Sequence, residues 1–177
     1  MPISLQAQWR LPHSESIPKP LLAWLTDAGS LTEKLKALPG DFQVQVLAET
    51  EAFADEHEYQ AMGLAKQPVI IREVLLYCAE VPLVYARSII PVPPENTPAE
   101  LTQLGNKPLG ELLFNRHDIE LGPIEIAEFT NNAPVCQLNQ QLHGSNATLW
   151  GRRRSFHLPE QAILVAEVFL SKAPCYA

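Results

Sequence analysis

The sequence predicts an α+β fold, a single antiparallel sheet with helices packed on one face or at its ends. Residues 68–78 and 83–92 are rich in β-branched side chains and are separated by a short turn, which is the pattern of a β-hairpin. A third apolar run, 162–170, has the length of a buried strand. The expected helices do not alternate regularly with these strands, as they would in a parallel sheet. The 177 residues, 46 % of them hydrophobic, suit a single domain, 1–177.

The first third of the chain predicts an irregular segment followed by two short helices. Residues 1–18 lack periodicity and contain three prolines, so we expect a mobile or loosely docked lead-in. Leucines at helical spacing after Pro20 predict a helix that Gly29 ends. Ser30-Leu31-Thr32-Glu33 has the form of a capping box and predicts the start of a second helix.

A strand is expected from Phe42, where apolar residues alternate with glutamines. The acidic segment 49–60 has little pattern and is interpreted as a loop or an irregular extension of that strand. A hairpin loop of two residues at 80–81, or of four at 79–82, would place Arg72 and Arg87 on one face as diagonal neighbours. A change of one residue in the loop would separate them onto opposite faces.

The second half of the chain predicts two more helices and two strands. Helices are expected at the capping box Thr97–Glu100 and at 108–114, and a strand at 123–129. Residues 130–148, rich in Asn and Gln, are interpreted as a long polar loop without a fixed shape. The three arginines at 152–154 precede the last strand, and at most two of them share a face.

Glu167 is the one ionisable residue in the apolar run AILVAEVFL, 162–170. At strand period it shares a face with Ile163, Val165 and Phe169, which predicts dry surroundings. A carboxyl group in such a place is protonated, paired or functional. A pairing with a structural arginine is the simpler interpretation, because structural ion pairs are common.

Composition limits the possible functions. The formal net charge of −7 argues against a nucleic-acid partner, which requires many Lys and Arg side chains. The N-terminus does not resemble a signal peptide and no segment is long and apolar enough for a membrane span, so we expect a cytoplasmic protein. Three widely spaced cysteines suggest neither a disulfide framework nor a zinc site, and the five histidines show no metal-binding spacing.

The candidate functional residues are scattered along the sequence and do not form a known catalytic motif. GxSxG, GxxxxGK and GxGxxG are absent from the sequence. What remains is a buried Glu167, an Arg72 in mid-strand and two helix starts, at Leu31 and Leu109. Free backbone N–H groups at helix starts receive carboxylates. These features together suggest a buried ligand cavity for an apolar small molecule that carries a carboxylate.

Five segments of the chain resemble, in order and spacing, the chorismate lyases of bacterial ubiquinone biosynthesis. The resemblance extends from about Pro20 to the C-terminus. The segments are IREVLLYC at 71–78, ARSIIPV at 86–92, LGNKPLGELLF at 104–114, WGRRRSF at 150–156 and AEVFLSKAPCY at 166–176.

The resemblance implies a cofactor-free enzyme that splits chorismate into 4-hydroxybenzoate and pyruvate and encloses its product beneath flaps. We expect no metal site and a monomer. It implies that Arg72 binds the benzoate carboxylate and that Glu167 lies at the hydroxyl end, the two catalytic candidates. Backbone N–H groups of Leu31 and Leu109 would hold the carboxylate, and Arg87 would be a second basic residue near the substrate. The 130–148 loop, longer than the family pattern, leaves the geometry of the flaps open.

Two alternatives to an enzyme remain at this point. A sensor domain that binds a carboxylated aromatic ligand without catalysis would use the same cavity. A structural or interaction protein would instead hold Glu167 and Arg72 as a buried ion pair. The sequence has no DNA-binding helix pair or basic arm, which counts against a complete transcriptional regulator.

Overall fold

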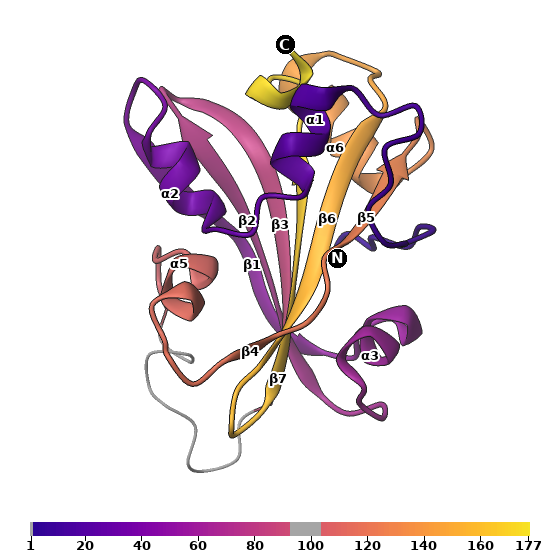
Figure 1. Ribbon diagram of the computed structural model, residues 1–177, viewed down its shortest axis with the longest axis vertical. Helices are drawn as coiled ribbons and strands as arrows, with labels where there is room; N and C mark the ends of the chain where they lie inside the picture. The colour runs from indigo at the N-terminus through magenta and orange to yellow at the C-terminus, as the bar shows by residue number, and fades with distance from the viewer. Residues whose placement is uncertain (1, 93–103) are drawn as a thin grey trace.

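The computed structural model describes residues 2–92 and 104–177, and these residues form a seven-stranded sheet in which all paired neighbours are antiparallel (Figure 1). The strand order is β1-β2-β3-β7-β6, and both β4 and β5 pair with the outer side of β6. The predicted α+β class is confirmed. The strands are β1 Phe42–Ala52, β2 Val69–Cys78, β3 Val81–Pro91, β4 Glu120–Leu121, β5 Glu125–Phe129, β6 Leu149–His157 and β7 Ala162–Phe169.

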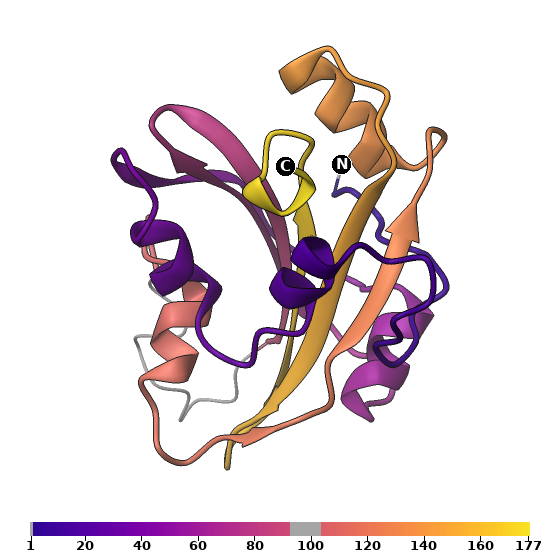
Figure 2. The same ribbon diagram turned by 45° about the horizontal axis from the view of Figure 1, so that its top comes forward.

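Helices cover both faces of the sheet, whereas the sequence suggested one face or the ends. Figures 1 and 2 show α2 and α5 on one side of the strands and α3 on the other. We call the side of α1, α2 and α5 the cavity face, and α3 and α6 pack on the opposite face. No described helix is long and apolar enough to cross a membrane. The helices are α1 Lys19–Leu25, α2 Leu31–Lys36, α3 Glu56–Met62, α5 Leu109–Phe114 and α6 Pro134–His143, and a 3₁₀ turn covers Pro174–Tyr176.

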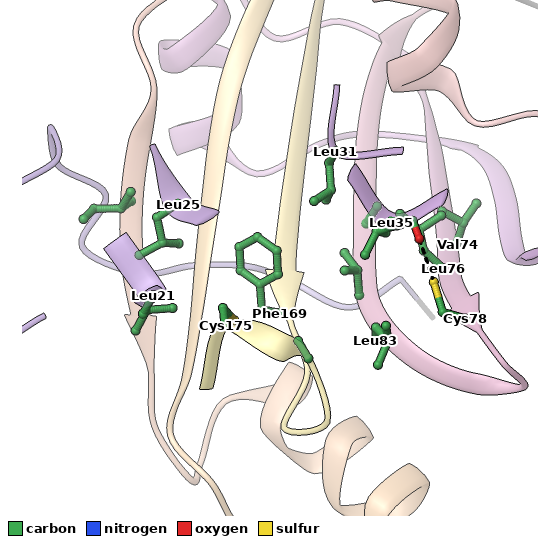
Figure 3. Close-up of a cluster of buried hydrophobic side chains, with 14 of the residues drawn as sticks. Leu21, Leu25, Leu31, Leu35, Val74, Leu76, Cys78, Leu83, Phe169 and Cys175 are labelled. Carbon is green, nitrogen blue, oxygen red and sulfur yellow. Dashed lines mark hydrogen bonds between the residues drawn. The ribbon is translucent and has the colours of Figure 1, made fainter. Parts of the chain in front are cut away.

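Leucines of the first two helices build the core of the cavity face (Figure 3). Leu31 and Leu35 lie one turn apart on α2 and are 3 % and 1 % exposed. The Cys78 thiol donates a hydrogen bond of 3.3 Å to the carbonyl of Leu35 and ties α2 to β2. Burying one such leucine contributes about 1.5–3 kcal/mol, so packing rather than propensity holds this six-residue helix.

The β2–β3 hairpin differs from the expected register by one residue. Its turn has two residues, Ala79 and Glu80, with φ of 49° and 65°, the positive values that a type I′ turn requires. A register shift follows between Leu76 and Tyr77, so that Arg72 opposes Ser88 and Glu73 opposes Arg87. The predicted shared face of Arg72 and Arg87 is therefore wrong, because one extra residue turns the rest of a strand over.

Two segments interpreted as loops contain helices. Asp55 and Glu58 form a reciprocal capping box that starts α3, and Gly63 ends it in the left-handed conformation. Within 130–148, Pro134 occupies the first turn of α6 and left-handed Gly144 ends it. These start and stop signals were present in the sequence. The segments between them are polar and were therefore interpreted as loops.

The N-terminal residues 2–18 are irregular, as their lack of periodicity suggested, but they are docked on the opposite face. Leu5 is 1 % exposed. The backbone N–H of Ile3 donates to Glu73 Oε1 at 2.7 Å, and Arg10 forms a bridge with Ile126. The capping box expected at 97–100 lies outside the described residues.

Candidate active site

A narrow hollow, here called the inner cavity, lies between the cavity face of the sheet and the starts of α2 and α5. Its walls are mostly apolar, with polar groups at a few points, which is the usual composition of a small-molecule site. The lining residues are Thr32, Arg72, Val74, Leu76, Ala86, Ser88, Pro108, Leu109, Gly110, Val165 and Glu167.

Arg72 is held in place at one end of the inner cavity. Its side chain is 2 % exposed, and Nη2 donates to the carbonyls of Gly105 and Lys107, each at 2.9 Å. Nη1 is buried, forms an ion pair of 3.6 Å with Oε1 of Glu49 and has no hydrogen-bond partner among the described residues. Burial lowers the pKa of Arg72 despite the opposing effect of Glu49. The guanidinium is therefore fixed by two carbonyls through Nη2, while Nη1 has only a long ion pair.

The starts of α2 and α5 meet at the inner cavity. The Ser30 hydroxyl accepts a hydrogen bond of 3.3 Å from the Glu33 N–H, as the capping box predicted. Thr32 of α2 lines the cavity beside Leu109 and Gly110 of α5, whose N-cap has no side-chain bond. N–H groups in the first turn of a helix have no partner within the helix, so both helices bring free donors to this region.

Glu167 lies on the central strand β7, between Ala86 of β3 and Arg152 of β6. Its side chain is 16 % exposed, and Oε1 accepts a hydrogen bond of 3.1 Å from Nε of Arg152. Nη1 of Arg152 donates in turn to the carbonyls of Trp24 at 3.1 Å and Asp27 at 2.8 Å. The structural pairing considered for Glu167 therefore exists, but with Arg152 rather than Arg72, and Glu167 lines the cavity as well.

A second narrow hollow adjoins the inner cavity, and we call it the arginine chamber. The two hollows share Val165 and Glu167 in their walls. Arg152 and Arg154 point into this region, because residues two apart on a strand share a face. Arg153 points to the opposite face, where it pairs with Glu125 at 3.0 Å. The chamber is lined by Asp27, Gly29, Phe114, Ile124, Arg152, Arg153, Arg154, Phe156, Val165 and Glu167.

Arg87 lies away from both hollows, contrary to the expected role near the substrate. It is 3 % exposed on the opposite face, where Nε and Nη2 each donate to a carboxylate oxygen of Glu58 at 2.8 Å. Nη1 donates to the carbonyl of Ile3 at 2.9 Å. Since Glu58 is itself 2 % exposed, Arg87 serves a buried structural ion pair.

Three of the five predicted site residues line the inner cavity: Arg72, Leu109 and Glu167. Leu31 does not line it, although the next residue, Thr32, does. Ser88, Arg152 and Arg154 were not among the residues expected at the site, yet they line one of the two hollows. The two-residue period of β6 indicates that Arg152 and Arg154 share a face of the sheet. It does not indicate whether that face is the cavity face or the opposite one.

A family model described as chorismate lyase matches residues 3–177. The chain belongs to the chorismate lyase family. A relative from Idiomarina loihiensis, named probable chorismate pyruvate-lyase, is 41 % identical over 99 % of this chain and 91 % of its own. A relative of the same name from Shewanella sp. strain MR-7 is 42 % identical over 91 % of this chain and 85 % of its own.

Solved structures with similar folds include domains of bacterial regulators. The effector domain of PhnF from Mycobacterium smegmatis has a TM-score of 0.59 at 18 % identity, over 81 % of this chain and 89 % of that domain. The C-terminal domain of the histidine utilization repressor from Pseudomonas syringae has a TM-score of 0.58 at 13 % identity, over 74 % and 92 %. At these identities the likeness concerns the fold alone, so this chain and these domains share a fold.

Proposed function

We propose that this protein converts chorismate into 4-hydroxybenzoate and pyruvate, the first step of the ubiquinone ring pathway. Family membership and relatives named probable chorismate pyruvate-lyase support the reaction. The observation that carries the proposal is the inner cavity, where Arg72 and Glu167 line the walls of one mostly apolar hollow. This arrangement fits a six-membered ring with a carboxylate at one end and the reacting groups at the other.

In the proposed complex the ring carboxylate lies against Arg72. Its Nη1, which makes no hydrogen bond to a described residue, donates to the carboxylate, while the carbonyls of Gly105 and Lys107 keep the guanidinium in position. Backbone N–H groups at the starts of α2 and α5, at Leu31 and Leu109, contribute further donors. The apolar side chains on the walls orient the ring and exclude water.

The formation of an aromatic ring provides much of the driving force of the proposed reaction, so the protein mainly orients the substrate and handles one proton. The bond between the ring and the ether oxygen breaks, and its electron pair leaves with the enolpyruvate. The C–H bond on the neighbouring carbon also breaks, and its electrons complete the aromatic ring. Glu167 accepts that proton and returns it to the enolpyruvate, which becomes pyruvate. Arg152 holds the carboxylate of Glu167 for this transfer through the 3.1 Å hydrogen bond.

Incubation of the purified protein with chorismate tests the proposal. Release of 4-hydroxybenzoate and pyruvate in equal amounts supports an enzyme. Tight binding of chorismate without turnover would instead identify a sensor domain, and neither binding nor turnover would identify a structural protein.

The variant Glu167→Gln tests the proton transfer. We expect its single-turnover rate to fall by about 10²- to 10⁴-fold, the usual contribution of a positioned acid or base. Glu128→Gln is the matched control, because Glu128 is exposed on β5. Full single-turnover activity of Glu167→Gln would refute a role in proton transfer.

We further propose a single-domain, monomeric, cytoplasmic enzyme. The three cysteines support a reducing compartment, because all of them are free and buried. Analytical ultracentrifugation at micromolar concentration tests the monomeric state, and a sedimenting mass near twice 19.7 kDa would contradict it.

A further inference from the structure

The proposed function leaves the arginine chamber without a role. This hollow adjoins Glu167 of β7 on the side of β6, whereas Arg72 lies on the other side, on β2. Chorismate carries two carboxylates, one on the ring and one on the enolpyruvyl group. The inner cavity provides a partner for the first of them at Arg72. The breaking bond and Glu167 lie between the two carboxylates, so the enolpyruvyl group extends beyond Glu167 and into the chamber.

Two arginines face the chamber, and only one of them is fully engaged. Arg152 donates to Glu167, Trp24 and Asp27 and is 6 % exposed. Arg154 donates through Nε to the carbonyl of Gly122 at 3.2 Å, and it forms no ion pair with any described residue. Its two terminal nitrogens make no hydrogen bond to the described part of the chain.

The surroundings of Arg154 favour the arrival of an anion. The side chain is half-buried, and both this burial and the neighbouring charge of Arg152 lower the pKa of Arg154. Glu167 opposes this effect, but its carboxylate is already hydrogen-bonded to Arg152. A guanidinium with two free nitrogens suits a carboxylate, which it binds through two parallel hydrogen bonds.

We propose that the arginine chamber is the subsite for the enolpyruvyl carboxylate and that Arg154 binds it. The inference rests on the proposed function and extends it to the second half of the substrate. Arg72 and Arg154 then provide one cation for each carboxylate of the substrate, and the Arg152–Glu167 pair lies two residues further along the strands on the same face. After the bond breaks, 4-hydroxybenzoate remains at Arg72 and pyruvate at Arg154.

This division of the site predicts that substrate and product depend differently on Arg154. The product 4-hydroxybenzoate has no enolpyruvyl carboxylate, so it does not touch the arginine chamber. We expect Arg154→Gln to lower kcat/KM for chorismate by about 10- to 150-fold, the contribution of one or two charge-assisted hydrogen bonds. The dissociation constant of 4-hydroxybenzoate should change by less than about threefold, which is under about 1 kcal/mol of binding free energy.

Three further variants distinguish a subsite from general damage. Arg72→Gln should weaken both chorismate turnover and 4-hydroxybenzoate binding. Arg154→Lys retains the charge and should recover part of the lost kcat/KM. Lys172→Gln removes one exposed positive charge after β7 and should leave both quantities unchanged. Thermal unfolding of each variant verifies that the folded protein is being compared.

Two results would overturn the inference. One is Arg154→Gln with wild-type kcat/KM for chorismate, and the other is an equal loss of 4-hydroxybenzoate affinity in that variant. If the wild-type protein makes no 4-hydroxybenzoate, the proposed function fails, and the subsite is then tested by calorimetric binding alone. In that case Arg154→Gln should weaken chorismate but not 4-hydroxybenzoate, and equal weakening or none would refute the subsite.

Discussion

Replacement of Arg87 by methionine tests whether this arginine is structural, as its place on the opposite face of the sheet indicates. Arg87 and Glu58 are 3 % and 2 % exposed and share two hydrogen bonds of 2.8 Å. Arg87→Met leaves the Glu58 carboxylate buried without its partner, which costs about 3–5 kcal/mol. For a chain of this size, that loss lowers Tm by about 6–20 °C, at about 2–4 °C per kcal/mol.

The measurement combines unfolding with activity. Urea and thermal unfolding should show the large loss of stability for Arg87→Met, and the double variant Arg87→Met/Glu58→Met should recover much of it, because the unpaired charge is gone. Arg116→Met is the matched control, since Arg116 also pairs with carboxylates but near the surface, where we expect a cost below about 1 kcal/mol for each pair.

The activity of Arg87→Met decides between the two roles of this arginine. At a temperature where the variant is fully folded, kcat/KM for chorismate should stay within about threefold of wild type, because the guanidinium faces away from both hollows. A 100-fold loss of kcat/KM in the folded variant, with little change in Tm, would refute a structural role and restore Arg87 to the substrate site.

Two further predictions concern the core. Burial raises the pKa of Cys175 to about 12, and the thiolate is the reactive form, so we expect thiol reagents to modify the three cysteines only after unfolding. Because the folded state keeps this proton, its stability should fall as pH rises above the ordinary cysteine value of 9.0, and an unchanged urea midpoint between pH 8 and 10 would contradict this. Gly151→Ala places a Cβ 3.0 Å from Cγ2 of Val168 and 3.2 Å from Cε2 of Phe129. Urea unfolding should therefore show a loss of about 1–3 kcal/mol in the free energy of unfolding. An unchanged free energy of unfolding would show that the neighbouring side chains move aside without cost.

Local patterns were sufficient for much of this protein. The alternation in β1, the β-branched runs of β2 and β3 and the apolar run of β7 predicted strands, because side chains on a strand have a strict two-residue period. The capping residue Ser30 located the start of α2 for an equally local reason, since a hydroxyl three residues ahead of an N–H can reach it. The same runs identified Arg72 and Glu167 as charged groups in apolar surroundings.

The partners of those charged groups required the tertiary structure. The face that Arg87 occupies depends on the register shift between Leu76 and Tyr77, and nothing in the local pattern marks this one extra residue. Glu167 meets Arg152 only because β6 pairs with β7 in one particular register. A strand pattern determines which residues share a face, whereas pairing with distant strands decides which face that is. The sequence by itself therefore determined the strands and the candidate residues, and the tertiary structure decided that Arg72 faces a cavity and Arg87 does not.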